Sequence, residues 1–179
     1  MSDGGMLAVS KQLRSLGIDI VRFNFLYREK HIGRPDAMPV LKQCVDAVTV
    51  YAREKVNPVR LLIGGRSMGG RAASMLVADR AVCDRLLLLA YPLHPPGQPA
   101  KRRVEHLPRI TVPVLCVNGT RDPFCNPALM TETLAGLGSN WRMLWLEGAD
   151  HSFHVLKSSG KTDADVLTDV ADAATAWLA

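Results

Sequence analysis

A serine flanked by glycines occurs in Gly65-Arg66-Ser67-Met68-Gly69, a spacing that suits a sharp turn from a strand into a helix. In such a turn, the residues two before and two after the serine come so close that side chains there would collide. An apolar run leads into the turn, and a helical pattern over 68–81 leads out of it. Ser67 is therefore a candidate nucleophile at a helix N-terminus, and the backbone N–H of Met68 is a candidate oxyanion donor.

An aspartate and a histidine follow in the chain order that serine sites of this kind use. Asp122 comes soon after an apolar run over 113–118, and His151 comes soon after another over 142–146. Because the carboxyl ends of parallel strands meet at one edge of a sheet, we expect both side chains beside Ser67. His151 would then accept the serine proton, and Asp122 would fix the tautomer of His151 and stabilise its imidazolium form.

Each of these three residues has a plainer interpretation when taken alone: an idle serine in a glycine-rich turn, a turn aspartate before proline, or a surface histidine. Asp150 is a rival acid, but a residue directly before His151 rarely reaches the far nitrogen of the ring. Cys125 lies near Asp122, but thiolate catalysis needs a base and a helix N-terminus, and Ser67 already holds that position. Three residues in the required order at three strand ends favour the Ser-Asp-His interpretation.

Several further residues could line a pocket around the serine. Arg66 lies within the serine turn and His94 lies in a proline-rich loop, so both are candidate substrate-binding residues. His154 comes three residues after His151, but no cysteine or carboxylate cluster joins the pair, so we expect no metal site. Three more basic side chains could join Arg66 in favouring an acidic substrate, namely Arg28, Lys30 and Arg34.

Strand and helix patterns alternate along the whole chain. Apolar or β-branched runs predict strands over 18–25, 59–63, 86–91, 113–118 and 142–146. Helical spacing predicts helices over 6–16, 40–55, 68–81, 127–137 and 164–178. This alternation predicts an α/β fold with a mainly parallel sheet that helices cover on both faces. The loops over 24–39 and 92–103 would form the walls of the pocket.

Composition excludes several classes of protein. The 179 residues are 47% hydrophobic and 22% charged, which fits a single globular domain over residues 1–179. The longest apolar run is too short for a bilayer and no signal-peptide pattern is visible, so we expect a cytoplasmic protein without membrane contact. The four cysteines lie far apart, which is typical of free thiols. The net charge of +5 comes from the first two thirds of the chain without interleaved aromatics, so we expect a solvated basic face and no nucleic-acid partner.

Several segments together resemble small bacterial α/β-hydrolase-like proteins, which are related to the dienelactone hydrolases and to the testis-expressed and NSL-complex hydrolase-like domains of eukaryotes. The matching segments span nearly the whole chain and are 21–25 (VRFNF), 64–71 (GGRSMGGR), 91–97 (YPLHPPG), 105–107 (EHL), 119–124 (GTRDPF) and 150–153 (DHSF). The resemblance implies an α/β-hydrolase fold with Ser67, Asp122 and His151 as catalytic triad, no cofactor and no particular substrate. Dienelactone hydrolases use a cysteine nucleophile, so their lactone substrate is not carried over.

The N-terminus departs from the pattern of these relatives. They begin with a strand and a His-Gly-x-Gly loop that supplies a second oxyanion donor, whereas this chain opens with the helical pattern over 6–16. We therefore expect an N-terminally truncated sheet with a gap between the strands over 18–25 and 59–63.

The sequence as a whole predicts a serine hydrolase that cleaves an ester or similar acyl bond of a small molecule. The alternative is a non-catalytic protein-interaction module with the same fold. The ordered serine, aspartate and histidine favour the enzyme, and the missing loop favours the module.

Overall fold

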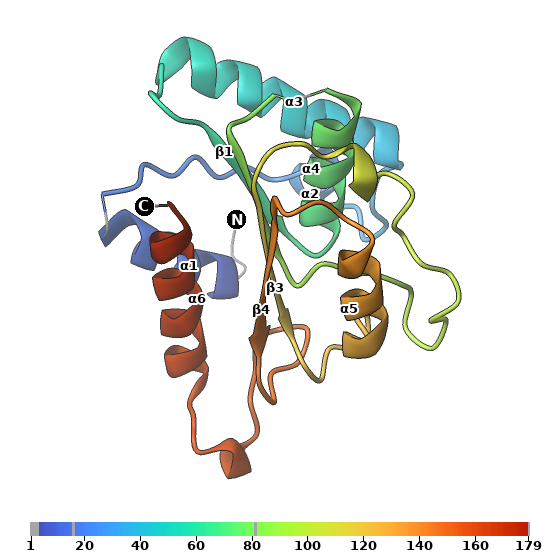
Figure 1. Cartoon of the computed structure of the whole chain (residues 1–179). Helices are drawn as coiled ribbons and strands as arrows, with labels where there is room; N and C mark the ends of the chain where they lie inside the picture. The colour runs from blue at the N-terminus through green and yellow to red at the C-terminus, as the bar shows by residue number, and fades with distance from the viewer. Residues whose placement is uncertain (1–3, 16, 81, 179) are drawn as a thin grey trace.

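Four parallel strands form the centre of the molecule (Figure 1). The computed structural model describes residues 4–15, 17–80 and 82–178, and its strands lie in the order β1 (Leu62–Arg66), β2 (Arg85–Leu89), β3 (Val114–Gly119) and β4 (Trp141–Leu146). Each strand pairs with the next one along the chain, so every connection crosses one face of the sheet. β2 and β3 are buried along nearly their whole length, as expected for the interior of a covered parallel sheet.

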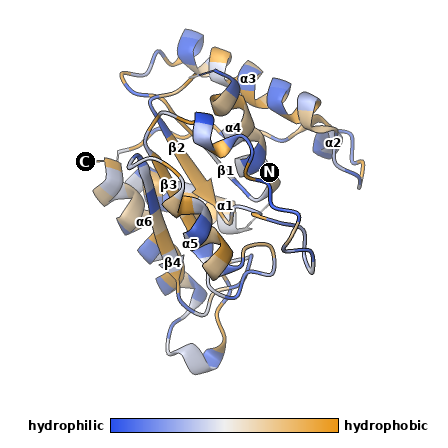
Figure 2. Cartoon of the chain, turned by 45° about the vertical axis from the view of Figure 1, so that its right-hand side comes forward, coloured by the Kyte–Doolittle hydropathy of each residue, from blue (hydrophilic) through white to orange (hydrophobic). Residues whose placement is uncertain are grey.

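Helices cover both faces of this sheet (Figure 1). One face is covered by α3 (Met38–Lys55), α4 (Met68–Asp79) and α5 (Pro127–Ala135), and the opposite face by α1 (Gly4–Ser15) and α6 (Asp163–Leu178). Alternate residues of β2 serve the two sides: Leu86 and Leu88 pack in the first core, whereas Leu87 and Leu89 pack in the second. Figure 2 shows apolar strands between helices whose outer sides are polar. The α/β fold class predicted from the sequence is confirmed.

The segment over 18–25 is not a strand, so this part of the prediction is wrong. Ile18 and Ile20 pack against the core below α1 and α6, and Phe25 packs against the core below α4. Val21 and Phe23 between them are 46% and 36% exposed. A strand needs a hydrogen-bonded partner, and among the described residues none pairs with this segment in a sheet. Its β-branched residues therefore pack as an extended connection.

β1 begins three residues later than the sequence predicts. Val59 is fully exposed, and Asp84 fixes the chain before the strand. The Asp84 carboxylate accepts the Leu61 N–H (2.7 Å), and the Asp84 N–H donates to the Leu61 C=O (2.9 Å). The strand then runs to Arg66 and leads directly into Ser67.

The other predicted elements agree with the structure to within a few residues at each end. Leu16 and Ala81, the last residues of two predicted helices, lie outside the described residues. The loop over 24–39 contains a short helix that the sequence did not predict, α2 (Leu26–Glu29), and 3₁₀ turns occupy Leu107–Arg109 and Lys157–Ser159. In the described part of the chain, no helix has both the length and the apolarity that a membrane span requires.

Candidate active site

Ser67 occupies a strained turn between β1 and α4. Its φ of 52° and ψ of −121° are values that residues other than glycine rarely adopt. The Ser67 N–H donates to the Leu89 C=O on β2 (2.8 Å), and the Ser67 C=O accepts the Arg71 N–H of α4 (3.0 Å). These two bonds hold the serine at the carboxyl end of the sheet, where α4 begins.

The glycines around Ser67 differ in the space that they leave. A Cβ on Gly65 would lie 2.5 Å from the backbone carbon of Gly69, and a Cβ on Gly70 would lie 2.6 Å from the Gly65 oxygen. A Cβ on Gly69 would meet only the ring of Phe25, at 3.7 Å. The second glycine without room for a side chain is therefore Gly70, and not Gly69 as the serine motif suggests.

Gly65→Ala should destabilise the protein, whereas Gly69→Ala should not. The first change forces two backbone segments apart, and overpacking of this kind costs about 1–3 kcal/mol. The second adds an ordinary contact to Phe25 in the first turn of a helix, where alanine is favoured over glycine by up to about 1 kcal/mol. Urea denaturation followed by circular dichroism measures both free energies of unfolding. Equal destabilisation by the two substitutions would contradict this description of the turn.

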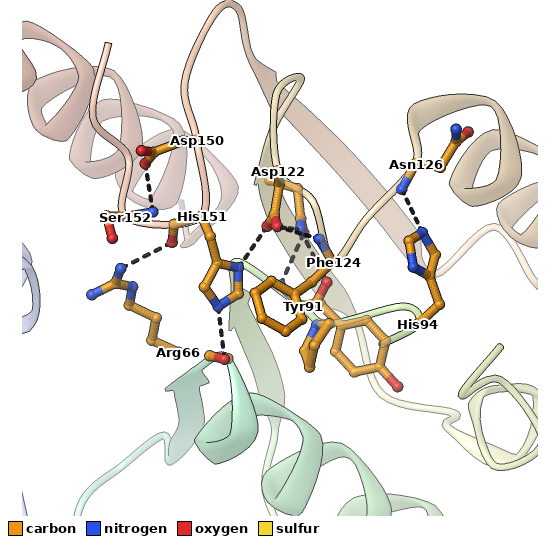
Figure 3. Close-up of polar contacts among 12 residues, drawn as sticks. Arg66, Tyr91, His94, Asp122, Phe124, Asn126, Asp150, His151 and Ser152 are labelled. Atoms are coloured by element: carbon orange, nitrogen blue, oxygen red, sulfur yellow. Dashed lines mark hydrogen bonds and ion pairs between the residues drawn. The ribbon is translucent and has the colours of Figure 1, made fainter. Parts of the chain in front are cut away.

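Ser67, His151 and Asp122 form a continuous line of hydrogen bonds, of which Figure 3 labels His151 and Asp122. The His151 Nε2 lies 2.8 Å from the Ser67 Oγ, and the His151 Nδ1 lies 2.8 Å from the Asp122 Oδ2. Because a carboxylate accepts hydrogen bonds, it favours the tautomer with a proton on Nδ1, in which Nε2 can accept the serine proton. The structure thus brings together three residues that follow three different strands.

The Asp122 carboxylate is also held by donors other than His151. Its Oδ1 accepts the N–H of Phe124 (2.8 Å), and its Oδ2 accepts the side-chain amide of Asn118 (3.3 Å). Asn118 is fully buried and exchanges two hydrogen bonds with the backbone of Tyr91, each 3.0 Å long. The segments after β2 and β3 together therefore aim Asp122 at the histidine.

Aromatic and cationic neighbours fix the loop that carries His151. The ring of Phe124 packs against the imidazole, with ring centroids 4.4 Å apart. Arg66 donates from Nη2 to the His151 C=O (2.9 Å), and its guanidinium lies 5.8 Å from the centre of the Phe153 ring. Arg66, expected to contact substrate, thus contacts the histidine loop (Figure 3).

Asp150 accepts hydrogen bonds within its own turn. Its Oδ1 accepts the N–H of Ser152 (2.7 Å; Figure 3) and the N–H of His154 (3.0 Å). Asp150 therefore stabilises the turn that contains His151. Asp122 is the acid that contacts the imidazole.

His94, the other candidate substrate-binding residue, is only 4% exposed. Its Nδ1 lies 2.9 Å from the Pro95 oxygen, and its Nε2 accepts the Asn126 N–H (3.1 Å) (Figure 3). The His94 N–H donates to the Phe124 C=O (3.0 Å). The Nε2 bond and the backbone bond thus join the proline-rich loop to the loop that follows Asp122, and the Nδ1 contact lies within the proline-rich loop.

Two other potentially reactive groups, the Cys125 thiol and the His154 imidazole, have surroundings that suit roles other than catalysis. Burial, and then the charge of Asp122, raises the pKa of the Cys125 thiol to about 12, so this side chain is neutral at ordinary pH. His154 pairs with Asp163 at the surface (2.9 Å), and this hydrogen bond raises the pKa of the histidine. Across residues 4–15, 17–80 and 82–178, no three His, Cys, Asp or Glu side chains gather as a metal ion would require.

A second serine–histidine pair lies in the interior, between residues 32 positions apart in the sequence, and no motif predicts it. The Ser74 Oγ lies 2.8 Å from the His106 Nε2, and the same hydroxyl donates to the Arg71 C=O (2.9 Å). The histidine is therefore the donor of this pair, opposite to the direction required of a base. Burial and then the charge of Arg71 lower the pKa of His106 to about 4. This neutral ring joins α4 to the chain before Leu107–Arg109.

Comparisons with known proteins agree with the fold. The sequence matches the family described as alpha/beta hydrolase domain over residues 1–179. The structure is similar to an α/β serine hydrolase homologue from Coxiella burnetii (21% identity, TM-score 0.78, covering 100% of this chain and 78% of that one). It is also similar to an α/β serine hydrolase without lid from Xanthomonas campestris (22% identity, TM-score 0.77, covering 99% of this chain and 73% of that one). A dienelactone hydrolase from Anabaena variabilis is similar as well (20% identity, TM-score 0.68, covering 98% of this chain and 78% of that one). At these identities the likeness shows a shared fold.

Proposed function

Because this chain belongs to the α/β-hydrolase domain family, we propose that it is a serine hydrolase that cleaves an ester or similar acyl bond. The observation that carries the proposal is the hydrogen-bonded line from Ser67 through His151 to Asp122, with both bonds at 2.8 Å. An idle serine needs neither a histidine at this distance nor a carboxylate held behind that histidine. The pair of Ser74 and His106 has the opposite donor direction and, among the described residues, no hydrogen-bonded carboxylate.

Acylation begins when the Ser67 Oγ attacks the acyl carbon and its proton passes to the His151 Nε2. Asp122 stabilises the imidazolium that forms. The carbonyl oxygen of the substrate becomes an oxyanion, and the imidazolium then gives its proton to the leaving alcohol as the acyl C–O bond breaks. The products are an acyl group on Ser67 and the free alcohol.

Deacylation repeats these steps with water. His151 takes a proton from the water that attacks the acyl group, and Ser67 leaves with a proton returned from His151. We assign the Met68 N–H to the oxyanion, because α4 begins at Met68 and the first N–H groups of a helix have no intrahelical acceptor. A donor in this position contributes about 10²- to 10³-fold to the rate.

Arg66 and His94 act as positioning residues in this proposal. Arg66 holds the backbone of His151, and His94 holds the loop beyond Asp122. Both keep Ser67, His151 and Asp122 within reach of one another, and the rate of proton transfer depends on this geometry.

Hydrolysis of p-nitrophenyl esters of increasing acyl length tests the proposed function. A serine hydrolase should release p-nitrophenol with saturable kinetics, whereas a non-catalytic interaction module should leave every ester at the buffer rate. His151→Ala should abolish turnover. The matched variant His154→Ala removes a surface histidine three residues away and should keep it.

A further inference from the structure

Two arginines near the serine turn have no carboxylate partner among the residues that the structure describes. Arg71 on α4 and Arg103 in the loop after β2 are both half-buried. Within the described residues, neither forms an ion pair. Arg102, by contrast, pairs with Glu132 (3.0 Å). Withdrawing a cation from water without a counter-charge is unfavourable, so this pair of arginines needs an anion.

Arg71 lies one helical turn beyond Ser67. Its N–H donates to the Ser67 C=O (3.0 Å), so the backbone of Arg71 is fixed beside the turn that presents Ser67. Its Nε atom is buried and has no hydrogen-bond partner among the described residues, so this donor calls for an acceptor.

Arg103 is fixed at the same end of the sheet. Its N–H donates to the Leu93 C=O (2.8 Å), and its Nη1 donates to the Pro92 C=O (3.3 Å). Its own C=O accepts the hydroxyl of Tyr91 (2.7 Å), a fully buried residue just beyond the carboxyl end of β2. Because β2 pairs with β1, these bonds hold Arg103 near the carboxyl end of the strand next to the one that leads into Ser67.

The charge of Arg71 acts on Arg103 and on two uncharged rings, those of Tyr91 and His106. Burial and then the Arg71 charge lower the pKa of Arg103, and the same two causes lower the pKa of His106. Burial raises the pKa of Tyr91, and Arg71 is the strongest charge that opposes this shift. Arg71 is therefore within electrostatic range of a second cation and two neutral side chains, and these four groups together carry a net positive charge.

We propose that Arg71 and Arg103 form an anion subsite beside Ser67, which binds a carboxylate or phosphate group of the substrate and so favours negatively charged esters. The inference rests on the proposed hydrolase function. Guanidinium groups bind both kinds of oxyanion through paired N–H donors. A bound anion would give the Arg71 Nε an acceptor and would offset the repulsion between the two cations.

Two esters with acyl groups of equal length test this subsite: p-nitrophenyl butyrate and the mono-p-nitrophenyl ester of succinic acid. The charged ester should have the higher kcat/KM by about tenfold or more, mainly through KM. Arg71→Gln and Arg103→Gln should each reduce this preference about tenfold, as expected for the loss of a charge-assisted hydrogen bond. Arg102→Gln removes the same charge from an arginine that is already paired with Glu132, and it should keep the preference.

Anion binding to the Ser67→Ala variant gives a readout that does not depend on hydrolysis. Succinate or inorganic phosphate, added at constant ionic strength, should raise its Tm, and the more effective anion identifies the preferred group. Adding Arg71→Gln or Arg103→Gln should remove the rise, whichever of them folds, and adding Arg102→Gln should not. Stabilisation without turnover of any ester would support the subsite and reject the hydrolase. Turnover without charge preference and without stabilisation by either anion would overturn the subsite and leave the hydrolase standing.

Discussion

Ser67→Ala should lower kcat about 10⁴- to 10⁶-fold and leave the fold intact, as removal of the nucleophile does in serine hydrolases. The substitution deletes the hydroxyl that lies 2.8 Å from the His151 Nε2. The strained backbone of the turn is held by bonds from the Ser67 N–H and C=O, which alanine retains. Steady-state hydrolysis of a p-nitrophenyl ester measures the loss of turnover, and circular dichroism checks the fold.

Ser74→Ala, on the helix that begins directly after Ser67, is the matched control. It removes the other serine that bonds to a histidine, and this bond joins two buried side chains away from Asp122. Turnover should stay within a few-fold of the wild type. The free energy of unfolding should fall by about 1–3 kcal/mol, because the buried His106 donor loses its acceptor. Loss of turnover in Ser74→Ala with activity kept in Ser67→Ala would mean that the nucleophile is wrongly assigned.

Asp122→Asn should lower kcat about 10⁴-fold with little change in structure. The amide has the shape of the carboxylate, but it can turn an N–H toward the His151 Nδ1. The imidazole would then carry its proton on Nε2, where it can no longer accept the proton of Ser67. The kinetic measurement is the same, and an unchanged Tm would show that the loss comes from the tautomer.

Asp150→Asn is the control for this second prediction. The residue lies next to His151 in the chain, and its Oδ1 accepts two backbone N–H groups within the turn. Asparagine keeps an oxygen for both bonds, so turnover should stay within a few-fold of the wild type. Comparable losses in Asp150→Asn and Asp122→Asn would contradict the assignment of the acid.

Ser67, Asp122 and His151 could be predicted from the sequence because each follows a strand that local patterns reveal. Parallel strands bring their carboxyl ends to one edge, so the three positions converge without any knowledge of the loops. The prediction of a strand over 18–25 was wrong for the opposite reason. The alternation of this segment is local, but strand formation depends on a hydrogen-bonded neighbour, which no local pattern reports.

The surroundings of the site could not be predicted in the same way. The sequence pointed to basic residues of the loop over 24–39, whereas the proposed subsite combines Arg71 of α4 with Arg103 of the loop that folds back after β2. The pairing of Ser74 with His106 likewise depends on that loop. Asn118 left a weak signal, since it is a polar residue at the end of an apolar strand.

Labelling with a fluorophosphonate, followed by mass spectrometry of the peptides, tests the nucleophile most directly. These reagents react with serines that a histidine activates, so the bond between Ser67 and His151 predicts one adduct per chain, on the peptide that contains Ser67. The adduct should persist in Ser74→Ala and disappear in Ser67→Ala and His151→Ala. An adduct on any other residue, or no adduct on the folded wild-type chain, would contradict the assignment of Ser67 as an activated nucleophile.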